Sequence, residues 1–233
     1  LVATQAGLRK DIEAGNVALA VKEMIFLPRE TIESRFNLSA QSGVVIEMLG
    51  SVTKGMVGTG FLYTNKDSLS IGVGGMLGDM KEQRTTPAEL LEHMKAHPAI
   101  APLIAGGETR EYAAHLLPEG GYRALPQLYG DGWLIAGDSA GFVNSVHREG
   151  SNMAMESGRL AAETLIEVLK AGNEPSTANL ASYKAKLDES FVMKDLKKYQ
   201  KIPETLHKQR QFITDYPPLF NEAAHKFLTV DGQ

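Results

Sequence analysis

Short apolar runs separated by turn residues dominate the first third of the chain. Residues 16–27 (NVALAVKEMIFL) predict a strand, because Pro28, which cannot donate to a strand ladder, ends the run. Residues 43–49, 58–63 and 69–73 predict further strands. The Thr-Asn-Lys-Asp sequence between the last two is typical of a hairpin turn. The pattern therefore predicts an antiparallel sheet rather than a series of β-α-β units.

Helices are expected beside this sheet. Residues 28–36 place proline first and acidic side chains in the first turns, which favours a short helix. Residues 86–97 predict a helix that Thr86 caps and whose apolar residues share one face. Residues 98–105 are apolar and loop-like, and residues 111–117 predict another strand.

The pattern changes after residue 131. Residues 133–136 (WLIA) form a continuous apolar run, as expected of a short strand covered on both faces. A glycine-rich loop follows, and residues 150–171 predict a long helix that ends at Gly172. Residues 177–207 are charged, with apolar residues at helical spacing, and predict a helical region.

Composition narrows the function classes. The chain has 233 residues, of which 43% are hydrophobic and 22% charged, and this excludes a disordered or fibrous protein. A formal net charge of −4 argues against a nucleic-acid partner, which would need a basic surface. The absence of cysteine excludes disulfides, thiolate catalysis and cysteine-bound clusters on this chain. It also agrees with a reducing compartment, so we expect a cytoplasmic protein.

The start of the sequence has no targeting features. Residues 1–7 contain neither an initiator methionine nor a signal-peptide core, and no apolar run approaches the roughly 18 residues that a membrane span needs. We therefore expect the sequence to be a piece of a longer protein whose preceding part is missing.

The candidate chemistry lies in the stretch from Gly137 to Asn152 (GDSAGFVNSVHREGSN), between a predicted strand and a predicted helix. Gly137 allows a tight turn, and the Asp138 carboxylate can accept hydrogen bonds from a ribityl or other polyol hydroxyl. Gly150, Ser151 and Asn152 begin the helix, whose free N–H groups can hold a phosphate, a carbonyl oxygen or a developing anion. We expect both ends of the stretch to contact one ligand.

This stretch and the helix after it, GDSAG…REGSNMAMESGRLAAE, resemble the second flavin-binding motif of the glutathione-reductase-type flavoproteins. The similarity is to the branch that contains p-hydroxybenzoate hydroxylase and geranylgeranyl reductase. Residues 147–152 (HREGSN) are most similar to the FixC-type dehydrogenases, relatives of electron-transfer flavoprotein–quinone oxidoreductase. The resemblance covers most of the chain, including Gly120 and Gly121 and the final helices.

The resemblance implies FAD as the cofactor and electron-transfer flavoprotein, a ferredoxin-like protein and a quinone as partners. It also implies peripheral association with the inner face of the cytoplasmic membrane. Asp138 would bind the ribityl chain, and the N–H groups of Ser151 and Asn152 would meet the pyrimidine end of the flavin, where the helix dipole favours negative charge. The residues expected to bind the cofactor are Gly137, Asp138, Ala140, Gly141, Glu149, Gly150, Ser151 and Asn152. We expect no catalytic nucleophile and no metal ligand from this chain.

The sequence departs from the family pattern in two ways. The GxGxxG unit that holds the pyrophosphate is absent, and Gly72, Gly74 and Gly75 do not replace it, because they follow a hairpin and no amphipathic helix is expected after them. The quinone-oxidoreductase relatives carry a cysteine-rich cluster domain, whereas this chain has no cysteine, so a ferredoxin-like partner would supply the cluster. We expect these 233 residues alone to bind FAD weakly or not at all.

Some residues have a chemical and a structural interpretation. His147 would be a proton relay or a hydrogen-bonded structural histidine. Arg148 and Glu149 would orient each other, dock a partner or remain solvated charges. His93 and His97 have metal-compatible spacing but no third ligand, so we expect no metal there.

Two longer stretches are also ambiguous. Residues 98–105 would contact a quinone tail or the membrane interface, or would pack in the core, which we favour. Residues 194–201 are rich in lysine and would form a solvated helix face, which we favour, or would dock an acidic electron-transfer partner.

The sequence therefore predicts an α/β fold: a glutathione-reductase-type FAD-binding fold without its N-terminal GxGxxG unit, with an antiparallel-sheet substrate domain and C-terminal helices. Residues 1–118 would form the substrate part, 119–175 the C-terminal portion of the FAD-binding domain, and 176–233 a helical region. The first functional hypothesis is an oxidoreductase that passes electrons between electron-transfer flavoprotein and a quinone or ferredoxin-like acceptor. The alternatives are a geranylgeranyl-reductase-like enzyme acting on isoprenoid lipids, and a truncated, non-catalytic assembly module.

Overall fold

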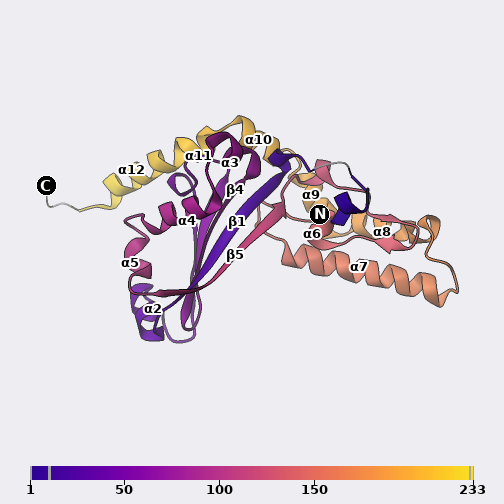
Figure 1. Cartoon of the computed structure of the whole chain (residues 1–233), viewed down its shortest axis with the longest axis horizontal. Helices are drawn as coiled ribbons and strands as arrows, with labels where there is room; N and C mark the ends of the chain where they lie inside the picture. Colours follow the sequence, from indigo (N-terminus) through magenta and orange to yellow (C-terminus); the bar gives the residue numbers. More distant parts are fainter. Residues whose placement is uncertain (1, 10–11, 231, 233) are drawn as a thin grey trace. The chain divides into compact units, whose positions relative to one another are not determined.

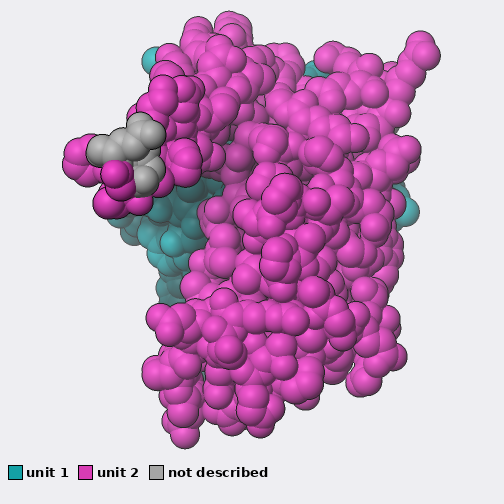
Figure 2. Space-filling model, turned by 90° about the vertical axis from the view of Figure 1, so that its left-hand side faces the viewer, with its two compact units in different colours: residues 1–17, 117–205 teal, residues 18–116, 206–233 magenta. Residues whose placement is uncertain are grey.

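The computed structural model describes residues 2–9, 12–230 and 232, which fall into two compact units (Figure 1). Unit 1 comprises residues 1–17 and 117–205, and unit 2 comprises residues 18–116 and 206–233 (teal and magenta in Figure 2). Each unit is therefore built from two segments that are distant in the sequence. The expected domain limits at residues 1 and 233 lie outside the described residues, and the functional division into three domains stays a prediction.

A five-stranded sheet forms the centre of unit 2, in the order β2-β3-β4-β1-β5. Its strands are β1 Val17–Phe26, β2 Val45–Met48, β3 Gly58–Thr64, β4 Ser68–Met76 and β5 Glu108–Pro118. Strands β2, β3, β4 and β1 pair antiparallel, and the Asn65 N–H donates to the Ser68 carbonyl across the predicted hairpin turn. The predicted strands and the antiparallel sheet are confirmed.

The core of unit 2 is formed by this sheet and helix α4 (Pro87–Lys95), where Leu90 and Met94 are fully buried. Thr86 caps α4 as predicted, because its hydroxyl accepts from the Glu89 N–H at 3.3 Å while the Glu89 carboxylate accepts from the Thr86 N–H at 2.8 Å. The predicted short helix near the start is α2 (Arg29–Arg35).

Two short helices of unit 2 were not predicted. Helix α3 (Leu77–Gln83) begins directly after β4, where the sequence analysis expected no amphipathic helix. These glycines still do not form a phosphate loop, because they lie inside β4, which pairs with β1 on one side and β3 on the other. Helix α5 (Ala101–Ile104) lies in the stretch expected to be a loop. Ile100 beside it is buried in the core, which supports the core interpretation of that stretch.

The last part of the chain divides between the units. Helices α8 (Thr177–Glu189) and α9 (Phe191–Lys198) belong to unit 1, whereas α11 (Gln211–Thr214) and α12 (Tyr216–Leu228) belong to unit 2. The division falls within α10 (Ile202–Lys208). The described part of the expected helical region therefore consists of several helices joined by short turns, and it is not one compact body.

Unit 1 is mainly helical. Its other elements are α1 Val2–Gln5, the short 3-10 turns at Ala14–Asn16 and Tyr122–Ala124, β6 Tyr129–Gly130, β7 Trp133–Leu134, α6 Gly137–Ala140 and α7 Ser151–Lys170. The core joins the segment around α6 to α7, α8 and α9, with Phe142, Met153 and Tyr183 fully buried. The Tyr183 hydroxyl donates to the Ile135 carbonyl at 2.9 Å. Helix α7 matches the predicted long helix, and Gly172, at φ +72°, follows its end.

The prediction of a buried strand at residues 133–136 was wrong. Strand β7 contains two residues and pairs only with β6 among the described strands, and both Trp133 and Leu134 are half-buried. The apolar run does not mark a strand covered on both faces, because Gly132, at φ +78°, sends the chain back along β6 in a tight hairpin. None of the described helices is long and apolar enough to cross a membrane.

Candidate functional site

Gly137 is the first residue of α6, and it packs against helix α7. Its φ of +58° lies in the left-handed region, and its N–H donates to the Ser157 hydroxyl at 3.0 Å. A Cβ at this position would lie 3.2 Å from the Ala154 Cβ, so the two segments approach more closely than a side chain allows without adjustment. Because Ser157 and Ala154 belong to α7, Gly137 holds the one-turn helix α6 against the first half of α7.

Asp138 is exposed at the start of α6. Among the described residues, no hydrogen bond or ion pair is seen for its carboxylate, although its backbone carbonyl accepts from the Gly141 N–H at 2.9 Å. A Cβ placed on Gly150 would lie 3.9 Å from Asp138 Oδ1. The carboxylate therefore lies beside the beginning of α7, 12 residues further along the chain.

The beginning of α7 lacks a side-chain cap. Gly150 occupies the N-cap position and has no side chain to cap the helix, although the Met153 N–H donates to Asn152 Oδ1 at 2.9 Å within the first turn. Ser151 is exposed and Asn152 is half-buried. A 20-residue helix concentrates partial positive charge at this end, so the N–H groups of Ser151 and Asn152 suit an oxygen acceptor or an anion.

The other expected site residues shape this segment. Ala140 and Gly141 are buried, and Gly141 ends α6 at φ +80°. Glu149 exchanges both backbone hydrogen bonds with Asn144, at 2.8 and 3.1 Å, and this closes the loop between them. The structure thus brings Asp138 and Gly150 together, while Ala140 is covered by the core of unit 1.

Asn144 is a residue of this segment that the sequence analysis did not single out. Its Oδ1 accepts from the N–H groups of Val146 at 3.0 Å and His147 at 3.3 Å. The residue is 3% exposed, and its Nδ2 is enclosed with no partner in the described part of the chain. An Asn that bonds to N–H groups two and three residues ahead is an Asx turn, and this local pattern could have been found in the sequence.

The neighbouring charged residues have structural partners. His147 Nε2 lies 2.7 Å from the Tyr199 hydroxyl, so the structural interpretation of this histidine has a partner, and the proton-relay role stays a hypothesis. Arg148, at φ +57°, lies near Glu119. Burial raises the pKa of the Glu119 carboxyl, although the positive charge of Arg148 acts in the opposite direction.

His93 and His97, whose spacing is compatible with a metal, each have a backbone contact. His93 Nε2 lies 3.1 Å from the Ser51 carbonyl, and His97 Nδ1 accepts from the Ala99 N–H at 3.2 Å. Within the described residues, no three metal-ligating side chains gather in one place.

These features fit a flavin. An exposed carboxylate without a partner can accept from the ribityl hydroxyls, and the uncapped start of α7 offers N–H donors to a ring carbonyl. In the loop between Asp138 and Gly150, the enclosed Asn144 Nδ2 has no hydrogen-bond acceptor among the described residues.

The chain is similar to known proteins over nearly its whole length. Protein FixC of Azotobacter vinelandii is 58% identical over 231 residues, which cover 99% of this chain and 53% of the relative. Protein FixC of Escherichia coli K12 is 40% identical over 234 residues, covering 100% of this chain and 54% of the relative. Residues 202–233 match the ETF-QO/FixC family C-terminal domain.

Solved structures show the fold. A geranylgeranyl bacteriochlorophyll reductase-like protein from Thermoplasma acidophilum matches with a TM-score of 0.66 at 16% identity, covering 86% of this chain and 46% of that one. A triple mutant of the flavin-dependent brominase Bmp2 matches with a TM-score of 0.57 at 16% identity, covering 97% of this chain and 59% of that one.

The architecture is therefore that of part of a flavin-dependent oxidoreductase fold, as predicted. The FixC resemblance is confirmed as well: nearly the whole chain is similar to proteins named FixC, and it spans about half the length of those relatives.

Proposed function

We propose that this chain forms part of an FAD site in an oxidoreductase that passes electrons between electron-transfer flavoprotein and a quinone or ferredoxin-like acceptor. The main support is the approach of the Asp138 carboxylate to the uncapped start of α7, seen in the 3.9 Å separation of Asp138 Oδ1 from the Cβ position of Gly150. The FixC relatives support the same class of function. Because the chain covers 53% of such a relative, the activity of the whole protein is part of the proposal.

FAD, when bound, supplies the electron-transfer chemistry, and the residues of this chain bind and orient it. Asp138 accepts hydrogen bonds from ribityl hydroxyls. The N–H groups of Ser151 and Asn152 donate to a carbonyl oxygen at the pyrimidine end of the flavin. The positive end of α7 favours negative charge there and so raises the reduction potential. Gly137 and Gly141 set the backbone path that keeps these groups together.

We propose the electron-transfer partners from the similarity to the FixC proteins. Lys194, Lys198 and Lys201 are exposed on and after α9 and offer a basic surface to an acidic electron-transfer protein. We place the protein in the cytoplasm, with peripheral association at the inner face of the cytoplasmic membrane where a quinone is the acceptor.

The test is the affinity of the chain for FAD before and after Asp138→Ala. Loss of a hydrogen bond to a charged group costs about 1.5–3 kcal/mol, so we expect affinity to fall by about tenfold or more. Glu174→Ala is the matched control, because it removes the same charge from an exposed loop of unit 1. Isothermal titration of FAD at millimolar concentration makes a weak complex measurable. Equal affinity of the wild type and Asp138→Ala would contradict the proposal.

The alternative functions give other results. A geranylgeranyl-reductase-like enzyme needs a long apolar channel to the loop at residues 143–147. One cavity of unit 1 is lined in part by Arg9, Glu13 and Asn16, and that loop is not among its lining residues. An assembly module without catalytic function would bind no flavin in the titration.

A further inference from the structure

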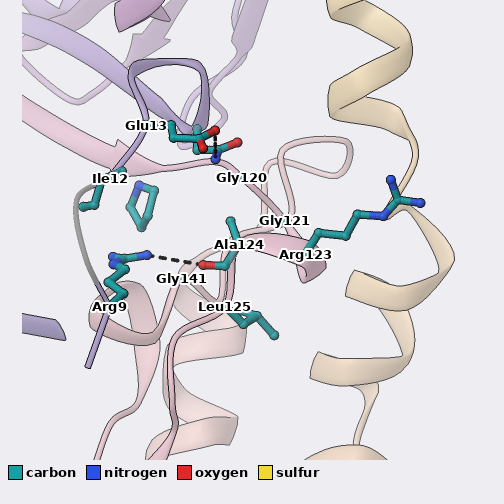
Figure 3. A pocket seen from close by; sticks show the side chains of 11 residues that line it. Arg9, Ile12, Glu13, Gly120, Gly121, Arg123, Ala124, Leu125 and Gly141 are labelled. Atoms are coloured by element: carbon teal, nitrogen blue, oxygen red, sulfur yellow. Dashed lines mark hydrogen bonds between the residues drawn. The ribbon is translucent and has the colours of Figure 1, made fainter. Parts of the chain in front are cut away.

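Unit 1 contains a pocket that the proposed flavin contacts do not use (Figure 3). Its volume is about 240 Å³, and its walls include Arg9, Glu13, Asn16, Gly120, Gly121 and Gly141. Pockets for drug-sized ligands have volumes of about 300–1,000 Å³, so this one suits a small ligand or one section of a larger one. Gly141 connects the pocket to the segment that carries Asp138.

Arg9 brings an incompletely paired cation to this pocket. Its Nη1 donates to the Ala124 carbonyl at 3.3 Å, a long hydrogen bond, and its Nε is enclosed without a partner among the described residues. No ion pair between described residues includes Arg9. Burial lowers the pKa of the Arg9 guanidinium, which remains charged at neutral pH. A half-buried guanidinium with spare donors is suited to an oxyanion.

Gly120 and Gly121 lie where segments of the pocket wall pack closely. A Cβ on Gly120 would lie 2.4 Å from the Ala124 Cβ and 2.9 Å from the Asn16 Cβ, so no larger residue fits there without movement. Gly121 has a φ of +63°, in the left-handed region that favours glycine. The two glycines therefore allow the turn that brings Ala124 and Asn16 together in the pocket wall.

The pocket also has groups suited to hydroxyls. Asn16 Nδ2 donates to Glu13 Oε2 at 3.4 Å, and Glu13 is exposed, so water screens its charge. In Figure 3 the Arg9 guanidinium lies beside Ala124, and the Glu13 carboxylate lies near Gly120. The pocket therefore offers a cation for an anionic group and, from Asn16 and Glu13, polar groups for hydroxyls.

The second arginine provides a contrast. Arg123 is paired with Glu204 at 3.2 Å, and its side chain is 57% exposed. Figure 3 shows it extending away from Arg9. The two arginines therefore differ in pairing and burial, although both line the same pocket.

The geometry points to a binding site for a phosphoryl group carried by a polyol: Arg9 holds the phosphoryl oxygens, and Asn16 and Glu13 bind hydroxyls. Such a group is supplied by the ribityl phosphate of a flavin nucleotide or by a separate sugar phosphate. A phosphoryl group that comes from a flavin nucleotide rests on the proposed function, because the flavin must then lie along the Gly137–Ala140 helix. The phosphoryl site itself does not depend on the proposed function.

The experiment measures binding of inorganic phosphate, FMN and riboflavin to the chain by amide chemical shifts and titration. We expect phosphate to shift the amides of Gly120, Gly121 and Gly141. Arg9→Gln weakens phosphate binding by about tenfold or more, equivalent to about 1.4 kcal/mol, and Arg9→Lys retains part of it. Arg123→Gln leaves phosphate binding unchanged. Melting temperatures of the variants verify that they are folded.

Equal phosphate affinity in the wild type and Arg9→Gln, or equal losses in Arg9→Gln and Arg123→Gln, would overturn the site. If FMN binds more tightly than riboflavin and Arg9→Gln abolishes this difference, the phosphoryl group is that of the flavin. If FMN and riboflavin bind alike while phosphate binding depends on Arg9, the ligand is a separate sugar phosphate. Riboflavin lacks phosphate, so its dependence on Asp138 tests the proposed function separately.

Discussion

Gly137 is the residue on which the position of Asp138 depends most directly. Its left-handed backbone, its N–H bond to Ser157 and the short approach to Ala154 all fix the same junction. Ser157 in turn donates to the Met153 carbonyl at 2.7 Å within α7. A side chain at Gly137 would disturb this junction and, with it, the path of the chain at Asp138.

Gly137→Ala should therefore destabilise the protein. An L-residue in the left-handed region costs about 1–2 kcal/mol, and the added Cβ also meets Ala154. Gly158→Ala is the matched control: Gly158 lies inside α7 and has open space around it, so alanine there should stabilise the protein by about 0.5–1 kcal/mol. Urea unfolding measures both changes. A neutral Gly137→Ala would show that this junction is not strained.

Asn144 should matter for the loop that precedes Gly150. Asn144→Ala removes the acceptor for the N–H groups of Val146 and His147, and the expected loss of stability is about 1–3 kcal/mol. Hydrogen exchange of the amides at 144–149 should become faster in this variant. Ser145→Ala is the control, since Ser145 is half-buried and its hydroxyl takes part in none of these bonds. Unchanged exchange in Asn144→Ala would contradict the role of the Asx turn.

For single residues, the sequence pointed to candidates for binding a cofactor but not to the contacts that hold them in place. The Gly-Asp pair and the helix start were visible as motifs, because each depends on residue type at a fixed place in the chain. The approach of Asp138 to Gly150 and the bond from Gly137 to Ser157 join residues that no local pattern connects.

Among the elements, those with strong local patterns were predictable. Helix α4 has a capping box, and the β3–β4 hairpin has turn residues between two apolar runs. Helices α3, α5 and α6 were missed because elements of one or two turns are too short to show helical periodicity. Strand β7 was overestimated because a four-residue apolar run does not reveal how many residues join a ladder.

Helix α3 contributes a buried ion pair within unit 2. Asp79 is 5% exposed and accepts from both terminal nitrogens of Arg210 and from the Val57 N–H at 2.9 Å. Burial would raise the pKa of the Asp79 carboxyl, but the bonds from Arg210 and Val57 outweigh it, and the pKa lies below its usual value. Ionised Asp79 therefore stabilises the folded state.

Asp79→Asn should lower the free energy of unfolding by about 1.5–3 kcal/mol at neutral pH. Because the folded pKa is below the unfolded one, this stabilisation is complete above the unfolded value of about 3.9 and is lost as the pH falls through the folded pKa. The difference between the wild type and Asp79→Asn should therefore be constant from about pH 5 to 8 and shrink below about pH 3.9. Urea unfolding across this range measures it, with the exposed Asp67→Asn as the control. If the difference in unfolding free energy between the wild type and Asp79→Asn grew as the pH fell, the result would contradict a stabilising Asp79–Arg210 ion pair.

For the whole molecule, the sequence predicted the fold class but not how its segments are grouped. Arg210 and Asp79 are 131 residues apart, and residues 206–233 join unit 2 through contacts of this kind. Composition and periodicity describe each segment alone, so they predicted a helical C-terminal region without indicating that it divides. The family resemblance, in contrast, came from the Gly137–Asn152 stretch and was confirmed over the whole chain.

The central claim is that Asp138 and the start of α7 bind one flavin. Amide chemical shifts of the isotope-labelled chain during titration with FAD test it most directly. The account predicts that the amides of Gly137, Asp138, Gly150, Ser151 and Asn152 shift together with a single dissociation constant, and that Asp138→Ala weakens this constant by about tenfold or more. Shifts confined to one end of the segment, different constants for its two ends, or no shifts there at millimolar FAD would contradict it.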